Sequence, residues 1–320
     1  AQAFSHRTLR YGFSRGRGRQ APFHNHWGAR DGPGIIDMKG GLVTCLYAIE
    51  ALLAEGFDDF GTIAILYDTD EERGNPSSRG LIEEMGEFAA AALVLEPARA
   101  DGSIVSARMG SAIGTISIEG IAAHAGVDPE RGRSAVEEVA RQIVRAYDLV
   151  RPGGTLNVTG LSGGERPHIV ADQAGCMIEI RAWQQETLDA MRNDLAKNIQ
   201  TPNVDGTRLS FSEGGERPAM EIGEETETLL SLAEEIASDV GVSFSHTRTG
   251  GGSDGNYLTP MRVPVLDGLG PVGGGLHTVD EYIELPSLVA RTAMLAALIE
   301  RISSGIRPDS PDKTEKQMFL

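Results

Sequence analysis

Cysteine is rare in this sequence, and long apolar runs are absent. Only Cys45 and Cys176 occur among 320 residues, and they lie far apart in the chain. Two distant cysteines exclude a disulfide framework and favour free thiols in a reducing compartment, with a single disulfide as the alternative. Because no apolar run is long enough to span a bilayer and no signal peptide opens the chain, we expect a cytoplasmic protein without membrane contact.

Basic residues are also fewer than acidic residues. The chain has 29 lysine and arginine residues against 46 acidic residues, which gives a net charge of −17. Such a charge opposes binding to a polyanion, so we expect no nucleic-acid partner for the molecule as a whole. Hydrophobic residues make up 40% of the chain, which is enough for two domains with separate cores.

Apolar periodicity predicts an α/β fold for the first and last parts of the chain. Residues 61–67 form a continuous apolar run, as is typical of a buried parallel strand, and segments of helical periodicity flank it. This alternation predicts a mostly parallel sheet flanked by helices. The predicted elements are helix 38–56, strand 61–67, helix 77–90, strand 91–95, helix 223–240, a strand near 264–267 and helix 286–303.

The middle of the chain has a different order of elements. Its pattern predicts strand 111–119, helix 131–149, strand 155–162, strand 173–183, helix 185–199 and strand 207–213. This β-α-β-β-α-β order is typical of a ferredoxin-like α+β domain. We therefore predict a small domain at 108–214, inserted between residues 1–107 and 215–303 of a larger one. Residues 304–320 are predicted to be a polar tail that frays.

Carboxylates stand in two short motifs. Asp37 lies in the run Gly-Ile-Ile-Asp-Met-Lys-Gly-Gly where a helix begins, so it is either an N-cap or a metal ligand, and the glycines favour the ligand. Glu71 and Glu72 follow a strand that is predicted to be buried, where adjacent carboxylates repel unless cations compensate. On an extended segment one can bind metal while the other acts as general base. An exposed acidic turn is the alternative.

Two more residues are candidate metal ligands. Glu96 ends the next apolar strand, and open α/β sheets place their sites at such strand ends; a surface glutamate before a turn is the alternative. His277 follows a glycine-rich loop and can reach a metal, although a lone histidine is more often not a ligand. Oxygen ligands together with one histidine suit zinc or a similar divalent cation.

The predicted inserted domain contributes two candidates. His124 is either a turn histidine or a polar group that reaches into a site. Arg181 ends a strand and could hold a substrate carboxylate with both of its terminal nitrogens, or it could simply pair with Glu179. A nucleotide-binding α/β domain is disfavoured because no G-x-G-x-x-G motif follows the first strand.

Taken in order, these motifs resemble the co-catalytic zinc peptidase and amidohydrolase family. That family includes glutamate carboxypeptidase, acetylornithine deacetylase, succinyl-diaminopimelate desuccinylase and aminoacylase. The resemblance covers residues 31–303, and its last two motifs favour the glutamate carboxypeptidase-like branch. The motifs are G-P-G-I-I-D-M-K-G-G, T-D-E-E, L-E-P, A-A-H-A-G, G-G-G-S-D-G-N and L-D-G-L-G-P-V-G-G-G-L-H-T-V-D-E-Y.

The resemblance implies a centre of two zinc ions, with cobalt or manganese as alternatives. Asp37 would bridge the two ions, and Glu72, Glu96 and His277 would complete the ligand set. Glu71 would be the general base for the water that hydrolyses the substrate. The implied reaction is hydrolysis of an amide or peptide bond next to a carboxylate-bearing residue, in a small molecule or short peptide.

The resemblance also implies a homodimer and a set of substrate contacts. His124 would stabilise the developing oxyanion from the partner subunit of that dimer. Arg181 would hold the substrate carboxylate, and Gly252, in the glycine-rich motif, would line the same binding region. His168 departs from the pattern, because the family often has asparagine at the corresponding position.

The upstream H-x-D-T motif of this family is absent from the written sequence. Residues 1–30 hold six arginines but no lysine and no acid. Read one nucleotide later, permitted codons for residues 7–14 give G-H-F-D-T-V-F-P. We hypothesise that residues 7–30 are translated out of frame in a chain truncated at its start. As written, the chain lacks a zinc histidine, so the alternatives are a catalytically impaired, dimeric binding protein and, less favoured, an Arg-Gly nucleic-acid patch at 15–19.

Overall fold

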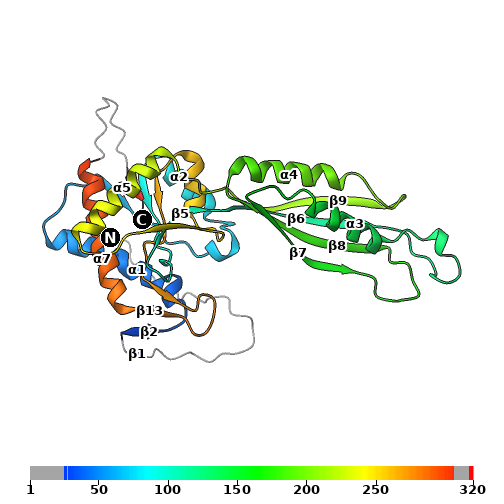
Figure 1. The fold of residues 1–320 in the computed structure, drawn as a ribbon, viewed down its shortest axis with the longest axis horizontal. Coiled ribbons are helices and arrows are strands. Elements are labelled where there is room, and N and C mark those ends of the chain that lie inside the picture. The colour runs from blue at the N-terminus through cyan, green and yellow to red at the C-terminus, as the bar shows by residue number, and fades with distance from the viewer. Residues whose placement is uncertain (1–24, 27, 306–316, 320) are drawn as a thin grey trace. The chain divides into compact units, whose positions relative to one another are not determined.

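The computed structural model describes residues 25–26, 28–305 and 317–319 of the chain (Figure 1). Its helices and sheets confirm the predicted α/β class. None of the helices in these stretches combines the length and the apolar character that crossing a bilayer requires. Both cysteines are buried and free, as predicted. Most of the segment assigned to a shifted reading frame lies outside the described residues.

The chain divides into two compact units. The larger unit comprises residues 1–106, 222–248 and 253–320, and the smaller unit comprises residues 107–221 and 249–252. The short return of the chain at 249–252 is a feature that the sequence pattern did not indicate. Two strands that the sequence analysis missed, β5 (Ile104–Arg108) and β10 (His246–Thr249), pair in a two-stranded sheet.

The main sheet of the larger unit is parallel, as predicted. Its order is β11-β4-β14-β3, and the paired strands run parallel throughout. The strands are short, because β3 covers Thr62–Ala64, β4 Ala89–Leu93 and β11 only Val265–Leu266. The prediction of a strand over the whole of 61–67 was therefore wrong at its C-terminal end, where the chain leaves the sheet before reaching the acidic motif.

The fourth strand of this sheet comes from the predicted tail. Strand β14, Gln317–Phe319, lies between β3 and β4, and Met318 is in register with Ile63 on one side and Ala91 on the other. The prediction that this end of the chain frays was thus wrong for residues 317–319. A three-residue strand carries no periodicity that could reveal it, and its partners lie more than 200 positions earlier in the chain.

The four longer helices described in the larger unit were predicted, whereas the four-residue helix α6 (Gly255–Leu258) was not. Helix α1 covers Gly40–Ala54, α2 Arg79–Gly86, α5 Glu224–Asp239 and α7 Leu285–Gly305. Apolar side chains of α1, α5 and α7 pack with those of the parallel strands into one core, which stabilises the unit because it removes apolar surface from water. The fully buried centre of this core includes Cys45, Ala48, Leu93, Ile104, Ala233, Leu266, Leu298 and Ile299.

A second, antiparallel sheet of the larger unit was not predicted. It forms from very short strands in the order β1-β2-β13-β12, and β2 and β13 are paired along their whole length. This sheet brings the segment that precedes Asp37 beside the segment that follows His277. Its strands are β1 (Asn25–His26), β2 (Ala29–Asp31), β13 (Tyr282–Glu284) and β12 (Gly273–Gly274).

The smaller unit is a ferredoxin-like domain, as predicted. Its antiparallel sheet has the order β7-β8-β6-β9, with one helix between β6 and β7 and another between β8 and β9 (Figure 1). The elements are β6 (Gly110–Glu119), α3 (Ala135–Tyr147), β7 (Gly154–Gly163), β8 (Gln173–Ala182), α4 (Gln185–Ile199) and β9 (Arg208–Arg217).

Alternation along the strands fixes which face of this sheet is covered. On β6, Ile116 and Ile118 are buried whereas Ile113 is exposed, as expected for a strand with one face against a core. Helix α3 begins at Ser134, whose hydroxyl accepts a hydrogen bond of 3.1 Å from the backbone N–H of Glu137, an N-cap that satisfies one free donor of the first turn.

Candidate metal centre

Asp37 is the buried carboxylate of the site. It lies in an irregular turn, Ile35–Lys39, just before α1, and its backbone there is not helical. The N-cap of α1 is Lys39, so Asp37 does not have the capping role that its sequence position allowed. The turn fits tightly, because a Cβ atom on Gly41 would lie only 2.2 Å from the carbonyl oxygen of Leu95. Only glycine allows this approach.

His277 meets Asp37 from the other side. It lies in the loop between β12 and β13, and its Nε2 atom is 3.0 Å from Asp37 Oδ2 and 3.5 Å from Glu72 Oε1. Its backbone has φ 62°, a left-handed conformation that is uncommon for a residue other than glycine. The ring remains 67% exposed, so packing alone does not explain its position.

Glu72 completes a group of three potential ligands. One ligand atom from each of Asp37, Glu72 and His277 lies within 4.8 Å of the others. Burial raises the pKa of the Glu72 carboxyl, and repulsion from Asp37 raises it further, while His277 lowers it. The expected extended segment at this motif was wrong, because Glu71–Arg73 form a short 3-10 helix. Glu71 is therefore half-buried at the start of that turn, and it is not one of the three grouped ligands.

A third carboxylate beside this histidine, that of Glu281, was missed in the sequence. Glu281 is buried, and its carboxylate accepts a hydrogen bond of 3.2 Å from the backbone N–H of His277. Its carbonyl oxygen accepts another from the N–H of Gly32. Burial raises the pKa of Glu281, and the charge of Asp37 adds to the effect, although backbone N–H groups lower it. Glu281 thereby joins the histidine loop to the strand that leads to Asp37.

Glu96 is not part of the three-residue group among the described residues. It follows β4 in a half-buried position, and its carbonyl oxygen accepts a hydrogen bond of 2.9 Å from the N–H of Gly270. The ligand role of the Glu96 carboxylate therefore remains a prediction that rests on the sequence pattern.

The remaining predicted residues belong to the smaller unit. His124 is exposed in a turn, where its Nδ1 atom accepts a hydrogen bond of 3.1 Å from the N–H of Gly126. Arg181 donates to Glu179 at 2.7 Å and to the carbonyl oxygen of Gly250 at 2.6 Å, so the pairing considered as its alternative role is present. The Gly252 carbonyl oxygen accepts from Arg108 at 3.2 Å, which holds the glycine-rich loop to the smaller unit.

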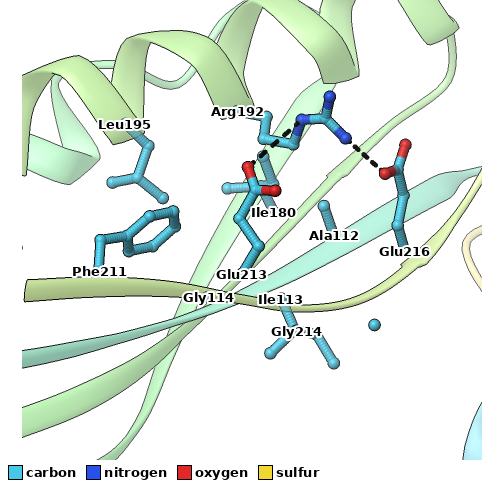
Figure 2. Close-up of a pocket in the computed structure, with 11 residues that line it drawn as sticks. Ala112, Ile113, Gly114, Ile180, Arg192, Leu195, Phe211, Glu213, Gly214 and Glu216 are labelled. Atoms are coloured by element: carbon cyan, nitrogen blue, oxygen red, sulfur yellow. Dashed lines mark hydrogen bonds and ion pairs between the residues drawn. The ribbon is translucent and has the colours of Figure 1, made fainter.

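A pocket of the smaller unit contains none of the predicted site residues. Figure 2 shows Arg192 of α4 between Glu213 and Glu216 of β9, with which it forms ion pairs. The ring of Phe211 packs over Gly114 so closely that a Cβ atom on this glycine would lie only 2.2 Å from a ring carbon. The pocket follows from the irregular register of β6 and β9 at this point, and its charged groups pair with one another.

The grouped residues fit a divalent cation. Two carboxylates and one imidazole supply the oxygen and nitrogen donors that zinc binds in proteins. Three carboxylates, those of Asp37, Glu72 and Glu281, lie around one histidine in a partly buried place, where their mutual repulsion calls for a positive charge. Each donor stands on a different segment of the larger unit, so an ion bound there would also hold those segments together.

Comparisons with known proteins point to one family. Residues 16–301 match the model of peptidase family M20/M25/M40. Carboxypeptidase G2 of Pseudomonas sp. (strain RS-16) is 31% identical over 291 residues, which is 89% of this chain and 70% of that protein. Succinyl-diaminopimelate desuccinylase of Thioalkalivibrio sulfidiphilus is 25% identical over 287 residues, covering 85% of this chain and 74% of that protein.

A solved structure shares the fold. The aminopeptidase PepT of Bacillus cereus aligns with a TM-score of 0.74 and 24% identity, over 88% of this chain and 76% of that one. The family match defines a hydrolase, and the group of Asp37, Glu72 and His277 is its candidate place for a metal ion. The chain belongs to peptidase family M20/M25/M40, whose members hydrolyse peptide and amide bonds and are generally metal-dependent, as the resemblance predicted.

Proposed function

We propose that this chain hydrolyses an amide or peptide bond next to a carboxylate-bearing residue, with two zinc ions at the site of Asp37. The observation that carries the proposal is the grouping of Asp37, Glu72 and His277 within 4.8 Å. Glu96 is proposed to hold the second ion. The names of two relatives support the substrate class, since a carboxypeptidase and a succinyl-diaminopimelate desuccinylase both cleave an amide near a carboxylate.

The chain's own residues have the following proposed roles. Zinc, when bound, supplies Lewis acidity toward a water molecule and the scissile carbonyl. Glu71 accepts the proton of the attacking water and passes it to the leaving amine. His124 donates a hydrogen bond to the developing oxyanion, and Arg181 holds the substrate carboxylate, with Gly252 lining the same region.

The test begins with protein stripped of metal by a chelator. Titration with Zn²⁺, Co²⁺ and Mn²⁺ should restore hydrolysis of N-acyl amino acids or dipeptides that end in a free carboxylate, and calorimetry should give two ions per chain. The same substrates with the carboxylate amidated should react at least about 10-fold more slowly, because one bidentate charged contact is lost. Equal rates on both forms would contradict the substrate class.

A second candidate is a catalytically impaired relative that binds ligands without turnover. The absence of the H-x-D-T motif from the sequence favours this second candidate. Residues 1–24, where the motif would be expected, lie outside the described residues. This candidate predicts at most one ion per chain and no restored hydrolysis. Sequencing the gene through codons 5–31 discriminates the two, because an inserted or missing base there would restore H-F-D-T.

We also propose a cytoplasmic homodimer assembled through the smaller unit. Strand β7 is an edge strand of the sheet, and such an edge offers free backbone groups to a second copy. Light scattering should give twice the chain mass, and mixing a His124→Ala chain with an inactive Glu71→Gln chain should restore activity if histidine acts across the dimer. Two inactive partners that stay inactive when mixed would place His124 within its own chain's site.

A further inference from the structure

The turn that carries Glu71 and Glu72 is held by one buried amide. The side chain of Asn75 is buried, and its Nδ2 atom lies 2.6 Å from Asp68 Oδ2, 3.0 Å from Ser78 Oγ and 2.8 Å from Asp254 Oδ1. These three acceptors come from before the turn, after the turn and a segment about 180 residues later. A buried polar group with several partners specifies one local arrangement.

The same turn is closed by its backbone. The N–H of Asn75 and the N–H of Arg73 both donate to the carbonyl oxygen of Asp70, at 2.9 and 3.0 Å, and the N–H of Gly74 donates to Glu71 at 2.8 Å. Asn75 has φ 55°, a left-handed conformation that asparagine tolerates better than most residues. Backbone and side chain of this residue therefore fix the path of the chain directly after the two glutamates.

The distant segment belongs to the glycine-rich motif near residue 250. Besides the bond from Asn75 to Asp254, the hydroxyl of Tyr257 donates to the carbonyl oxygen of Gly74 at 3.2 Å. Ser253 donates in turn to the buried carboxylate of Asp267, which follows strand β11. A polar chain thus runs from the main sheet to the glutamate turn, entirely within the larger unit.

We propose that Asn75 and Asp254 are positioning residues for the metal centre. Their hydrogen bond anchors the turn of Glu71 and Glu72 to the segment 253–257, so that Glu72 faces Asp37 and His277 before any ion binds. The effect on metal rests on the proposed function, whereas the anchoring of the turn does not. Groups that orient metal ligands change metal affinity or activity by about 10- to 100-fold when they are removed.

The test compares three variants of the full chain. Asn75→Gly removes the amide but keeps a residue that adopts the left-handed backbone without strain. Asp254→Ala removes the acceptor, and Asp254→Asn is the matched control because its side-chain oxygen can still accept the bond. Amide hydrogen exchange at residues 71–75 should be at least about 10-fold faster in the first two variants, and Zn²⁺ binding to the metal-free protein about 10-fold weaker.

Other outcomes separate the possible failures. The double variant should lose little beyond Asn75→Gly alone, because the bond that Asp254→Ala removes is already absent there, and exchange in α5 should not change. Unchanged exchange at 71–75, or an Asp254→Asn protein as loosened as Asp254→Ala, would overturn the anchoring. Faster exchange with unchanged Zn²⁺ affinity would overturn its role in the metal centre. If the wild-type chain binds no Zn²⁺, the proposed function fails while the exchange data still decide the anchoring.

A variant that fails to fold would not end the test. Tyr257→Phe removes only the hydroxyl that reaches Gly74, in a ring that is otherwise buried. It should raise exchange at the Gly74 amide and its neighbours by a few-fold, with a Tm close to that of the wild type, because only one hydrogen bond is lost. No change in exchange at these amides would count against the anchoring.

Discussion

The two units of this molecule are built in opposite ways. All four strands of the smaller unit are 10 residues long and pair antiparallel, and its elements follow one another in one stretch of chain. The parallel strands of the larger unit have 2 to 5 residues, and they come from distant parts of the sequence. The larger unit is therefore held by contacts between distant parts of the chain, and the candidate metal site is one of the places where such contacts meet.

The largest expected effect is confined to the site. His277→Ala should reduce metal-dependent hydrolysis by more than about 100-fold, because one of three grouped ligands is lost. The ring is 67% exposed, so in the metal-free protein the unfolding of both units should hardly change. The measurement pairs steady-state kinetics with thermal unfolding, and His246→Ala, a histidine outside the group, is the matched control. A large loss of Tm in the His277 variant would show that the site is part of the fold's stability.

A backbone change in strand β14 should destabilise the larger unit and leave the stability of the smaller unit unchanged. Met318→Pro removes the N–H of a strand that is paired on both sides, and proline inside an element costs about 3 kcal/mol or more. Hydrogen exchange should become faster in α5 of the larger unit and stay unchanged in α4 of the smaller unit. Met318→Leu is the control that keeps the N–H. Equal acceleration in both helices would show that the units unfold together.

A buried carboxylate gives the smaller unit its own pH dependence. Glu138 is fully buried; burial would raise its pKa, but hydrogen bonds from Asn203, Gln142 and the Val204 N–H outweigh that effect and lower it. A lowered pKa contributes stability above the ordinary value of 4.5, and that stability is lost as pH falls through the folded-state pKa. Glu138→Gln should cost about 1 to 3 kcal/mol at pH 7.

The pH series checks the sign of that prediction. Denaturant unfolding of the smaller unit, followed in α4, should show the wild type and Glu138→Gln converging as the pH falls below that of an ordinary glutamate. The larger unit, followed in α5, should show no difference at any pH. If the difference in the free energy of unfolding between the two proteins stays constant down to acidic pH, the effect comes from side-chain packing and not from the charge of Glu138.

The smallest effect is expected on the surface of α3. Arg141 pairs with Glu137 at 2.7 Å, and both side chains are at least half exposed. An exposed pair of this kind contributes little because water screens it, so Arg141→Ala should change unfolding by no more than about 0.5 kcal/mol. This variant sets the baseline against which Glu138→Gln, on the same helix, is judged.

The sequence predicted best where a period repeats. Helix α4 covers the predicted residues 185–199 because its apolar spacing continues over four turns, and strand β6 alternates in burial over its ten residues. It failed where an element has two or three residues, as in β2, β13 and β14, because no period exists there. The prediction of an extended segment at Glu71 also failed, because the turn there is held by the hydrogen bond of Asn75 to Asp254, a residue far away in the sequence.

Some residues of the candidate site could likewise be predicted from the sequence, and others could not. Asp37, Glu72 and His277 were found because their chemistry and the order of their motifs are recognisable, although Asp37 and His277 are 240 residues apart. Glu281, Asn75 and Asp254 were missed as site residues because a single polar side chain carries no pattern. Their importance comes from what they contact, and only the fold defines that.

The place of β14 has a consequence for how the chain acquires its structure during synthesis. Strands β3 and β4 leave the ribosome early, yet in the sheet each of them pairs with residues 317–319 between them. The ferredoxin-like unit is encoded between these partners and can complete its sheet from its own residues. The parallel sheet cannot be closed until residues 317–319 are made, and until then its two early strands expose backbone groups that other chains could pair with.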